Sequence, residues 1–398
     1  MRTVCVGGGP AGLYYAILAK LRRESDDVLV VERNESGVTF GWSVTFGEDF
    51  LDDLHRNDPV SARAIHQAAL LWGDQVVLVG DARPVHLGGK YGYSIDRTRM
   101  LDVLARRAEQ LGVELRFGAH AGSESDFDAD LVLAADGVGS RLRARHAEHF
   151  GTTITPGRNR YVWLGTSRSF EAFTFAFERT EAGLVWFYAY PSSDEASTCI
   201  VECSPETWSG LRLDTMEPSA GVGMLEGLFA RALDGHRLLE PAGGLGADPW
   251  LHFREIRNAT WRRDNLVLVG DSAHTTHFGI GAGTVLAVQD SIALADAVYG
   301  AGLAAGLDIY DRVRRAELDP IQDMARRSMQ FFETIDSRPV DDPVRFAYAL
   351  LNRRGDQPAW QYRVHQATQI DGLRQVRRTI TNARRTARAV KRSRNAPA

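Results

Sequence analysis

The chain has 398 residues, of which 44% are hydrophobic and 25% charged, so it can bury a large core and is not disordered as a whole. Its 47 Lys and Arg against 51 Asp and Glu give a net charge of −4, which argues against a nucleic-acid partner. The three cysteines lack CxxC spacing, so we predict neither a metal site nor a disulfide framework. No apolar run approaches ~18 residues and no signal segment follows Met1, so we expect a soluble cytoplasmic protein without membrane contact.

The first residues predict one βαβ unit. Residues 3–6 (TVCV) have the apolar run of a buried strand, residues 10–23 have the pattern of a helix, and residues 28–32 (VLVVE) have that of a second strand. Because strands joined by a crossover helix pair in parallel, we expect a parallel sheet here.

The stretch VGGGPAG lies between the first strand and the first helix, where Gly7, Gly9 and Gly12 satisfy the GxGxxG pattern. The first glycine permits a tight turn, the second allows a pyrophosphate to approach the backbone, and the third allows the helix to pack on the strand. Glu32, at the end of the second strand, is placed to accept hydrogen bonds from a ribose diol. Together these features predict a dinucleotide site.

Helical and strand-like patterns continue along the chain. We expect helices at 97–111 and 284–298 and strands at 113–117, 131–135 and 266–269. Between residues 160 and 203, aromatic and β-branched segments separated by turn residues are typical of an antiparallel sheet. After residue 298 the chain is predicted to remain helical, with breaks at Pro320 and Pro343.

Two further turns carry polar residues. Asp136-Gly137 ends an apolar strand, and by itself this pair is compatible with an ordinary solvated loop. GDSAHTTHFGIGAG, residues 270–283, joins a strand to a helix, where backbone N–H groups and the positive end of the helix dipole favour an anion or a polar ring. We therefore expect a polar ligand at the second turn.

The motifs in this order resemble those of the single-component FAD-dependent aromatic hydroxylases. The resemblance covers most of residues 1–310 and rests on GxGxxG with Glu32 and Arg33, IDRTRMLDVL, DGVGSRLR, and GDSAH with its glycine-rich helix start. It implies an α/β fold in which a Rossmann-like FAD-binding domain of the para-hydroxybenzoate hydroxylase (GR2) type is interrupted by a mixed, mainly antiparallel substrate domain. The expected boundaries are 1–74, 95–157 and 255–310 for the FAD-binding domain, 75–94 and 158–254 for the substrate domain, and 311–398 for a helical C-terminal region.

The resemblance also implies the cofactor contacts and the chemistry. FAD would be bound by Gly7, Gly9, Pro10, Ala11, Gly12, Glu32, Arg33, Arg97, Asp136, Gly137, Asp271, Gly281, Ala282, Gly283 and Thr284. Only one strand-linked GxGxxG is present, so NADH or NADPH would bind transiently as co-substrate. With O2, such an enzyme forms a flavin C4a-hydroperoxide that hydroxylates an electron-rich ring.

The catalytic and substrate-binding candidates are histidines and aromatic residues. His277 is the first candidate for a base and Phe278 lies beside it, while His274, Tyr188 and Tyr190 are weaker candidates for the same role. The alternative for His277 is a structural one, in which it caps the turn. Trp42, Trp163 and Tyr188 are expected to contact substrate, and Trp186 and Phe187 either extend that aromatic wall or belong to the plain core.

Departures from the common motif narrow the resemblance to one branch. Phe278 and Val285 replace a Pro and an Asn, as in the branch containing salicylyl-CoA 5-hydroxylase, anthraniloyl-CoA monooxygenase and the violacein-pathway hydroxylase. Ser43 and Thr45 depart from the GWGVV that is more usual within it. An aryl-CoA thioester such as salicylyl-CoA is the expected substrate, and an indolic natural-product intermediate is the alternative. A halogenase is disfavoured because WxWxIP is absent, whereas a non-catalytic FAD-binding sensor stays open.

Basic residues bear on the proposed substrate. Nine Arg or Lys and no acid follow Gly372, which predicts either a solvated helical tail or contact with a polyanion, a phosphate-rich substrate or a carrier protein. Arg158, Arg160 and Arg168 are further candidates for contact with the phosphates of a CoA or carrier-bound substrate. We expect a monomer or a homodimer.

Overall fold

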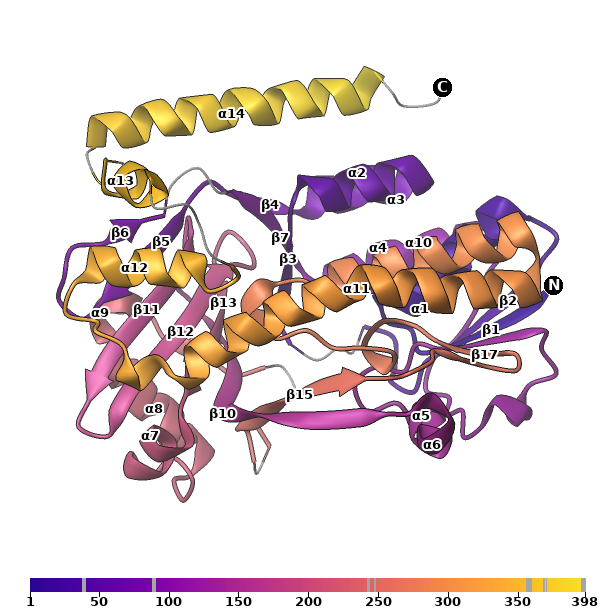
Figure 1. Ribbon diagram of the computed structural model, residues 1–398, viewed down its shortest axis with the longest axis horizontal. Coiled ribbons are helices and arrows are strands. Elements are labelled where there is room, and N and C mark those ends of the chain that lie inside the picture. The colour runs from indigo at the N-terminus through magenta and orange to yellow at the C-terminus, as the bar shows by residue number, and fades with distance from the viewer. Residues whose placement is uncertain are drawn as a thin grey trace.

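The computed structural model describes residues 1–37, 41–87, 91–241, 244–246, 248–355, 360–367, 369 and 371–394. Three sheets form two halves of an elongated molecule, with a long helical segment along one side (Figure 1). The predicted α/β fold with a Rossmann-like half and a mainly antiparallel half is confirmed.

The nucleotide-binding half is built on a six-stranded sheet. Its order is β16 (Arg262–Arg263), β17 (Leu266–Leu268), β9 (Leu131–Ala134), β1 (Arg2–Val6), β2 (Asp27–Val31) and β8 (Glu114–Arg116). All neighbours pair in parallel except β16, as the buried apolar runs predict. The carboxyl ends of β1, β9 and β17 therefore lie side by side, and each leads into one of the predicted motif turns.

Three long helices cover this sheet. They are α1 (Pro10–Arg22), α4 (Arg97–Gln110) and α10 (Gly283–Ala301). Helix α1 is buried on nearly all sides because it packs between α4 and α10. Two shorter helices stand beside α4 and α10, namely α2 (Glu48–Asn57) and α3 (Pro59–Ala68). Near β16 lie η1 (Glu124–Asp126), α5 (Arg141–Arg145) and α6 (Ala147–Phe150).

The second half is built on an eight-stranded sheet. Its order is β14 (Leu238–Leu239), β10 (Thr153–Thr166), β13 (Ser197–Cys203), β12 (Gly183–Pro191), β11 (Phe173–Thr180), β5 (Gln75–Val79) and β6 (Val85–His86), with β15 (Leu251–Arg257) also paired to β10. One face packs on α7 (Pro205–Gly210), α8 (Pro218–Leu228) and α9 (Ala230–Leu233). The other face, here called the inner face, carries Tyr161, Trp163, Trp186, Tyr188, Ile200 and Glu202.

A small sheet links the two halves. Strand β7 (Gly92–Asp96) pairs with β3 (Ser43–Phe46) and with β4 (Leu70–Trp72). Of the segment 75–94, β5 and β6 thus join the large sheet, whereas β7 lies in the small one. Ser43 fixes the junction: its N–H donates to Thr198 Oγ1 at 3.1 Å, and its carbonyl accepts from the Tyr190 hydroxyl at 2.9 Å.

The C-terminal region is helical, as expected, but one predicted break is wrong. Helix α11 (Leu303–Glu333) runs through Pro320 without interruption. Pro320 and Ala316 are both exposed, so water can bind the carbonyl that loses its intrahelical partner. Pro343, in contrast, begins a new helix in the first-turn position that suits proline.

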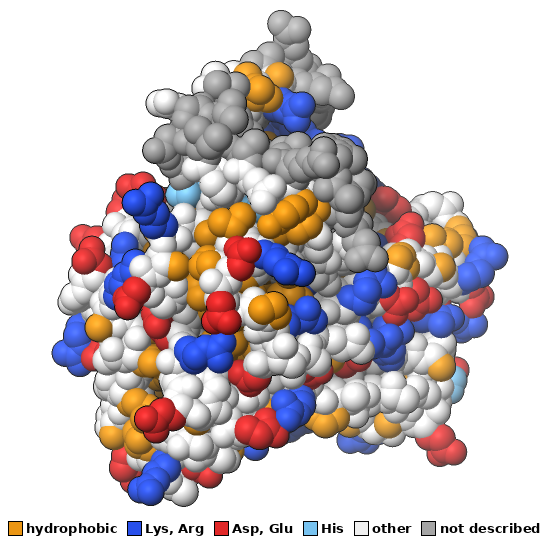
Figure 2. Space-filling view, turned by 60° about the vertical axis from the view of Figure 1, so that its left-hand side comes forward, with side chains coloured by type: hydrophobic (Ala, Val, Ile, Leu, Met, Phe, Trp, Pro, Cys, Tyr) orange, Lys and Arg blue, Asp and Glu red, His pale blue; other side chains and the backbone are white. Residues whose placement is uncertain are grey.

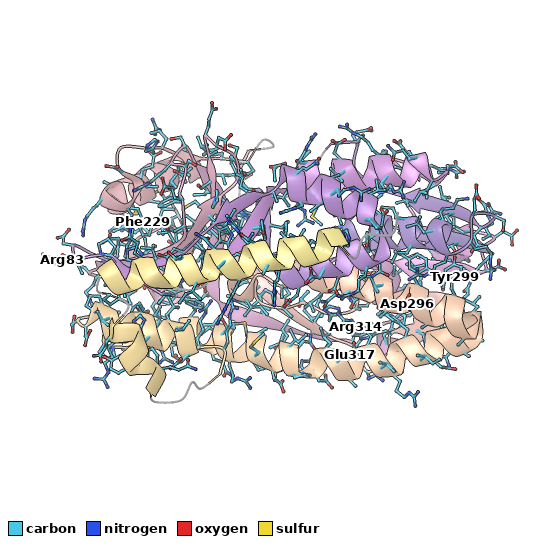
Figure 3. The ribbon with its side chains drawn as sticks, turned by 90° about the horizontal axis from the view of Figure 1, so that it is seen from above. Arg83, Phe229, Asp296, Tyr299, Arg314 and Glu317 are labelled. Carbon is cyan, nitrogen blue, oxygen red and sulfur yellow. The ribbon has the colours of Figure 1, made fainter. Side chains whose placement is uncertain are left out.

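The remaining helical elements follow α11. They are η4 (Ile335–Ser337), α12 (Pro343–Asn352), α13 (Trp360–Ala367) and α14 (Asp371–Arg394). Seen from above, α14 runs along the length of the molecule from the large sheet toward the nucleotide-binding half (Figure 3). Its Arg392 meets Glu48 at 2.5 Å and Asp52 at 3.1 Å. These ion pairs attach the basic tail to α2.

Candidate functional site

The glycine turn after β1 has the geometry that close approach of a ligand requires. Gly7 has φ +116°, and a Cβ there would lie 2.2 Å from the carbonyl oxygen of Ala135. A Cβ on Gly12 would lie 2.0 Å from the carbonyl oxygen of Gly7, so only glycine permits helix and turn to pack. A Cβ on Gly9 would meet no protein atom within 4 Å, which leaves open space where a pyrophosphate would approach. Pro10 begins α1, and the Ala11 carbonyl accepts from Ser291 Oγ at 2.8 Å.

Glu32 lies beside this turn, at the end of β2. Its Oε2 accepts from the Gly8 N–H at 2.7 Å, and its Oε1 accepts from the Asn34 N–H at 2.8 Å. Each carboxylate oxygen can accept a second hydrogen bond, so the side chain is both fixed and still able to bind a hydroxyl group. Arg33 is exposed next to it.

The Asp136-Gly137 turn lies at the end of the neighbouring strand β9. Asp136 Oδ2 accepts from the Arg141 N–H at 2.8 Å, while its Oδ1 is buried and has no partner in the described chain. Gly137 has φ +80°. Arg143 connects this turn to the next one, because its guanidinium donates to the carbonyls of Val138 at 2.8 Å and Ser272 at 3.0 Å.

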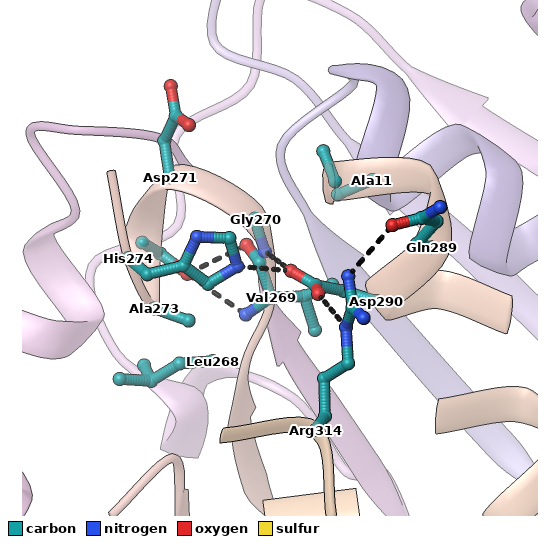
Figure 4. A network of polar contacts seen from close by, with 12 residues as sticks. Ala11, Leu268, Val269, Gly270, Asp271, Ala273, His274, Gln289, Asp290 and Arg314 are labelled. Carbon is teal, nitrogen blue, oxygen red and sulfur yellow. Dashed lines mark hydrogen bonds and ion pairs between the residues drawn. The ribbon is translucent and has the colours of Figure 1, made fainter. Parts of the chain in front are cut away.

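The GDSAH segment after β17 is held by a buried network (Figure 4). Asp290 Oδ2 accepts from the Gly270 N–H at 2.9 Å and meets His274 Nε2 at 2.7 Å, while Oδ1 accepts from Arg314 Nε at 2.7 Å. Despite burial, the pKa of Asp290 lies below its ordinary value because His274 and Arg314 stabilise the carboxylate. His274 thus supports the turn, and its place in this network argues against a role as the base.

Asp271 points away from that network, as Figure 4 shows, and faces Arg97. Burial raises the pKa of Asp271, and the electrostatic effects of His274 and Arg97 oppose this shift. Burial also lowers the pKa of Arg97. Both side chains nevertheless keep accessible surface: Asp271 is exposed and Arg97 is half-buried. A ligand can therefore reach both of them.

The turn at 278–284 lies next to Asp271. Gly281 has φ +64°, and a Cβ there would lie 2.8 Å from Thr45 Oγ1. A Cβ on Gly283 would lie 3.9 Å from Asp271 Oδ1. Helix α10 starts after Ala282 without any side-chain cap, so the first N–H groups, including that of Thr284, are left for a ligand.

His277 is buried and caps the short helix η3 (Phe278–Ile280). Its Nδ1 accepts from the Gly279 N–H at 3.2 Å. Burial, with the nearby charge of Arg353, lowers the pKa of His277 to about 3. A base this weak is a poor proton acceptor at neutral pH, so the geometry favours the structural alternative over the predicted general base.

Phe278 connects the turn to the inner face of the large sheet. Its ring lies 4.6 Å from that of Tyr161 and 5.6 Å from that of Tyr188, measured between centroids. Trp42 and Trp163 lie nearby in a reciprocal arrangement: the ring of Trp163 packs on Gly41, and that of Trp42 packs on Gly165. Residues from β10, β12 and the β3 loop are thus brought together.

The predicted aromatic wall divides between the two faces of the sheet. Trp186 and Tyr188 lie on the inner face, where Trp186 stacks on Phe332 at 5.8 Å. Phe187 lies on the opposite face against Phe229 at 4.9 Å, because successive side chains of a strand alternate. Phe187 therefore belongs to the core, which is one of the two alternatives that the sequence left open.

Sequence reasoning missed Glu202. This carboxylate is buried on the inner face and accepts from the Tyr188 hydroxyl at 2.6 Å and from Asn159 Nδ2 at 2.8 Å. Burial raises the pKa of Glu202 to about 7, although both hydrogen bonds oppose the shift. The only signal in the sequence was one acid within the apolar strand STCIVEC.

The arginines considered for phosphate contact lie elsewhere. Arg158 pairs with Glu206 at 2.5 Å, Arg160 lies over the ring of Trp208, and Arg168 donates to the Ala232 carbonyl. All three are on the side of the sheet that α7 to α9 cover. Acidic and basic side chains are interspersed on the face shown in Figure 2, without a field of one sign.

The part of the chain that the structure describes contains no cluster of three or more His, Cys, Asp or Glu suited to a metal. All three cysteines there are free and buried. None of the described helices is long and apolar enough to cross a membrane.

Comparison with known proteins gives matches over most of the chain. The FAD binding domain family matches residues 248–325. The chain is 35% identical over 366 residues to a salicyloyl-CoA 5-hydroxylase of a Streptomyces species, covering 89% of this chain and 70% of that protein. It is 34% identical over 362 residues to the 3-hydroxy-4-methyl-anthranilyl-(aryl-carrier protein) 5-monooxygenase of Streptosporangium sibiricum, covering 91% and 96%. Identity to the protodeoxyviolaceinate monooxygenase of Chromobacterium violaceum is 28% over 380 residues, covering 90% and 96%.

Solved structures share the fold. A variant of 2-methyl-3-hydroxypyridine-5-carboxylic acid oxygenase superimposes with a TM-score of 0.66 at 17% identity, covering 89% of this chain and 96% of that one. CtdE in complex with FAD and a substrate gives a TM-score of 0.66 at 16% identity, covering 94% and 99%.

Proposed function

Since the chain belongs to the FAD-dependent aromatic hydroxylases, we propose that it hydroxylates the ring of an aromatic acid held as a thioester, with NAD(P)H and O2. The observation that carries the proposal is the similarity over about nine-tenths of the chain to two relatives whose names place the acid on CoA or on a carrier protein. A carrier-bound or CoA-bound aryl group is therefore the substrate class that we favour.

The residues of the three turns fit FAD. Gly9 leaves open space, Asp136 Oδ1 is buried without a partner, and α10 starts with uncapped N–H groups. We propose that the glycine turn and Glu32 bind the adenosine and pyrophosphate part, while Arg97 and Asp271 lie along the linker. The N–H groups of residues 281–284 would bind the polar edge of the ring. When bound, FAD supplies the transfer of electrons from NAD(P)H to O2 and of one oxygen atom to the ring.

The protein itself must position the substrate and exclude water. Phe278, Tyr161, Trp163 and Tyr188 provide an aromatic surface next to the turn. Glu202 and Tyr188 form a buried acid pair connected to that surface, since the Tyr188 ring contacts Phe278 while its hydroxyl donates to Glu202. We propose that this pair accepts a proton when the ring of the substrate is activated.

The test is oxidation of NADH and of NADPH by the FAD-loaded protein in the presence of different aromatic acids. Salicylyl-CoA, anthraniloyl-CoA, the corresponding carrier-protein thioesters and the two free acids would be compared, with product masses measured. We expect stimulated oxidation and the gain of one oxygen atom with a thioester, and neither with the free acids.

Other outcomes separate the alternatives. Product from an indolic intermediate, with none from any thioester, would favour a natural-product hydroxylase like the violacein-pathway relative. Bound FAD without ligand-stimulated oxidation by any aromatic compound would favour a non-catalytic FAD-binding protein. A matched protein carrying Asp194→Asn, an exposed loop substitution, controls for preparation effects.

A further inference from the structure

Two arginines that follow α12 contact the backbone carbonyl groups of the turn before Gly281. Arg353 Nη2 donates to the Gly279 carbonyl at 2.8 Å, and its Nη1 donates to the Leu350 carbonyl at 2.7 Å. Arg354 Nη2 lies 3.3 Å from the Gly279 carbonyl and 3.2 Å from that of Ile280. Both guanidinium groups therefore converge on two consecutive carbonyl groups of η3.

Neither of these guanidinium groups meets a carboxylate within the described residues. Arg353 instead lies over the rings of Phe175 and Phe332, at 5.4 and 5.5 Å from their centroids. The Nε of Arg354 is buried and has no hydrogen-bond partner among the residues that the structure describes. The buried Arg314 offers the contrast, because it meets Asp290 at 2.7 Å. Figure 3 shows Arg314 on α11, next to Glu317.

Arg353 and Arg354 are half-buried, and it is costly to remove two neighbouring positive charges from water without an acid beside them. Burial, followed by the charge of Arg354, lowers the pKa of Arg353 to about 9, so the group still carries its proton at neutral pH. The cost falls when negative charge is placed nearby. The part of the chain that the structure describes does not supply that charge, and a reduced flavin bound beyond the turn would supply it.

We infer that Arg353 and Arg354 are positioning residues that set the 279–284 turn and supply positive potential for the negative charge of reduced flavin. This rests on the proposed function, in which residues 281–284 face the polar edge of the flavin ring. Transfer of a hydride adds two electrons and one proton, so the reduced ring carries one more negative charge than the oxidised ring. The carbonyl groups of Gly279 and Ile280 also repel that charge less when they accept hydrogen bonds from the guanidinium groups than when they are unpaired.

The test compares the midpoint potential of bound FAD in the wild type, Arg353→Gln, Arg353→Lys and Arg354→Gln, without substrate. Arg345→Gln is the matched control, since Arg345 is exposed on the same helix. We expect each glutamine variant at 353 or 354 to shift the flavin equilibrium at least tenfold toward the oxidised form, which is about 30 mV for a two-electron couple. Arg353→Lys should retain most of the wild-type potential, and Arg345→Gln all of it.

FAD-loaded Arg353→Gln and Arg354→Gln proteins with wild-type potentials would overturn this inference, even if they bound substrate poorly. An Arg353→Lys potential as low as that of Arg353→Gln would overturn the electrostatic part, because lysine keeps the charge. Should Arg353→Gln fail to fold, as judged by thermal unfolding, Arg354→Gln decides. A wild-type protein that binds no FAD would instead overturn the proposed function, and this inference with it.

Discussion

The hydroxyl group of Tyr188 donates a 2.6 Å hydrogen bond to Glu202, and both side chains are buried on the inner face of the large sheet. Burial raises the pKa of Glu202 from its ordinary 4.5 to about 7. The folded protein therefore holds a proton that the unfolded chain releases between these values. The contribution of Glu202 to stability is full below pH 4.5 and is lost as the pH rises through about 7.

Glu202→Gln should consequently flatten the pH dependence of thermal unfolding. The free energy of unfolding of the wild type should fall by as much as about 3 kcal/mol from this group across that window, whereas glutamine does not titrate. Melting temperatures from about pH 5 to about pH 8 measure the effect. Glu206→Gln, at an exposed position, is the control. Parallel curves for Glu202→Gln and the wild type would contradict the prediction.

The sequence predicted the sheets better than the side-chain roles. Strand and helix patterns are local, so the βαβ unit and the antiparallel segment could be read from periodicity. The hydrogen-bond partners of Glu202 could not be read from periodicity, because Tyr188 and Asn159 lie on two other strands and the register of the sheet determines which residues meet. The same holds for Phe187, whose position in an aromatic run did not reveal which face it occupies. Pro320 misled because it lies on the exposed face of α11, where water can replace the hydrogen bond that proline removes.

Two glycines of the first turn should respond differently to alanine. Gly12→Ala places a Cβ 2.0 Å from the Gly7 carbonyl oxygen. The protein should therefore fail to fold, or its free energy of unfolding should fall by at least about 1–3 kcal/mol because of overpacking. Gly9→Ala meets no protein atom within 4 Å and should melt like the wild-type apoprotein. It should still weaken FAD binding at least about tenfold, because its methyl group occupies the pyrophosphate space. Thermal unfolding and flavin fluorescence titration measure the two effects.

The control for this pair is Gly227→Ala in α8, which also has open space around it and lies on the far face of the large sheet. It should change neither the FAD affinity nor the fold. Equal FAD affinities of Gly9→Ala and the wild type would place the cofactor elsewhere.

His277 should matter for stability and not for the pH dependence of turnover. Its pKa of about 3 keeps the ring neutral throughout the neutral range, so no limb of a rate profile there belongs to it. His277→Asn can retain the acceptor for the Gly279 N–H, whereas His277→Ala removes it and should cost about 1 kcal/mol or more as a lost cap. The pH profile of kcat for the asparagine variant is the measurement. Loss of an ionisation that the wild type shows near neutrality would restore His277 as the base.

Asp271 should lower the stability of the apoprotein at neutral pH and strengthen the binding of FAD. Burial raises the pKa of Asp271, so its contribution to stability depends on pH in the same direction as that of Glu202. The protonated carboxyl group contributes stability below its unfolded pKa, and this contribution is lost as the pH rises. At neutral pH, Asp271→Asn should therefore raise the melting temperature of the apoprotein. The same substitution should weaken FAD binding, since it removes the carboxylate that lies near Arg97 and Gly283. Bound FAD stabilises by mass action, so the order of the two melting curves should reverse when FAD is added in excess. The control Asp194→Asn, on an exposed loop, should leave both curves unchanged. An Asp271→Asn apoprotein that melts below the wild type would contradict the prediction, because the carboxylate would then be needed for the fold itself.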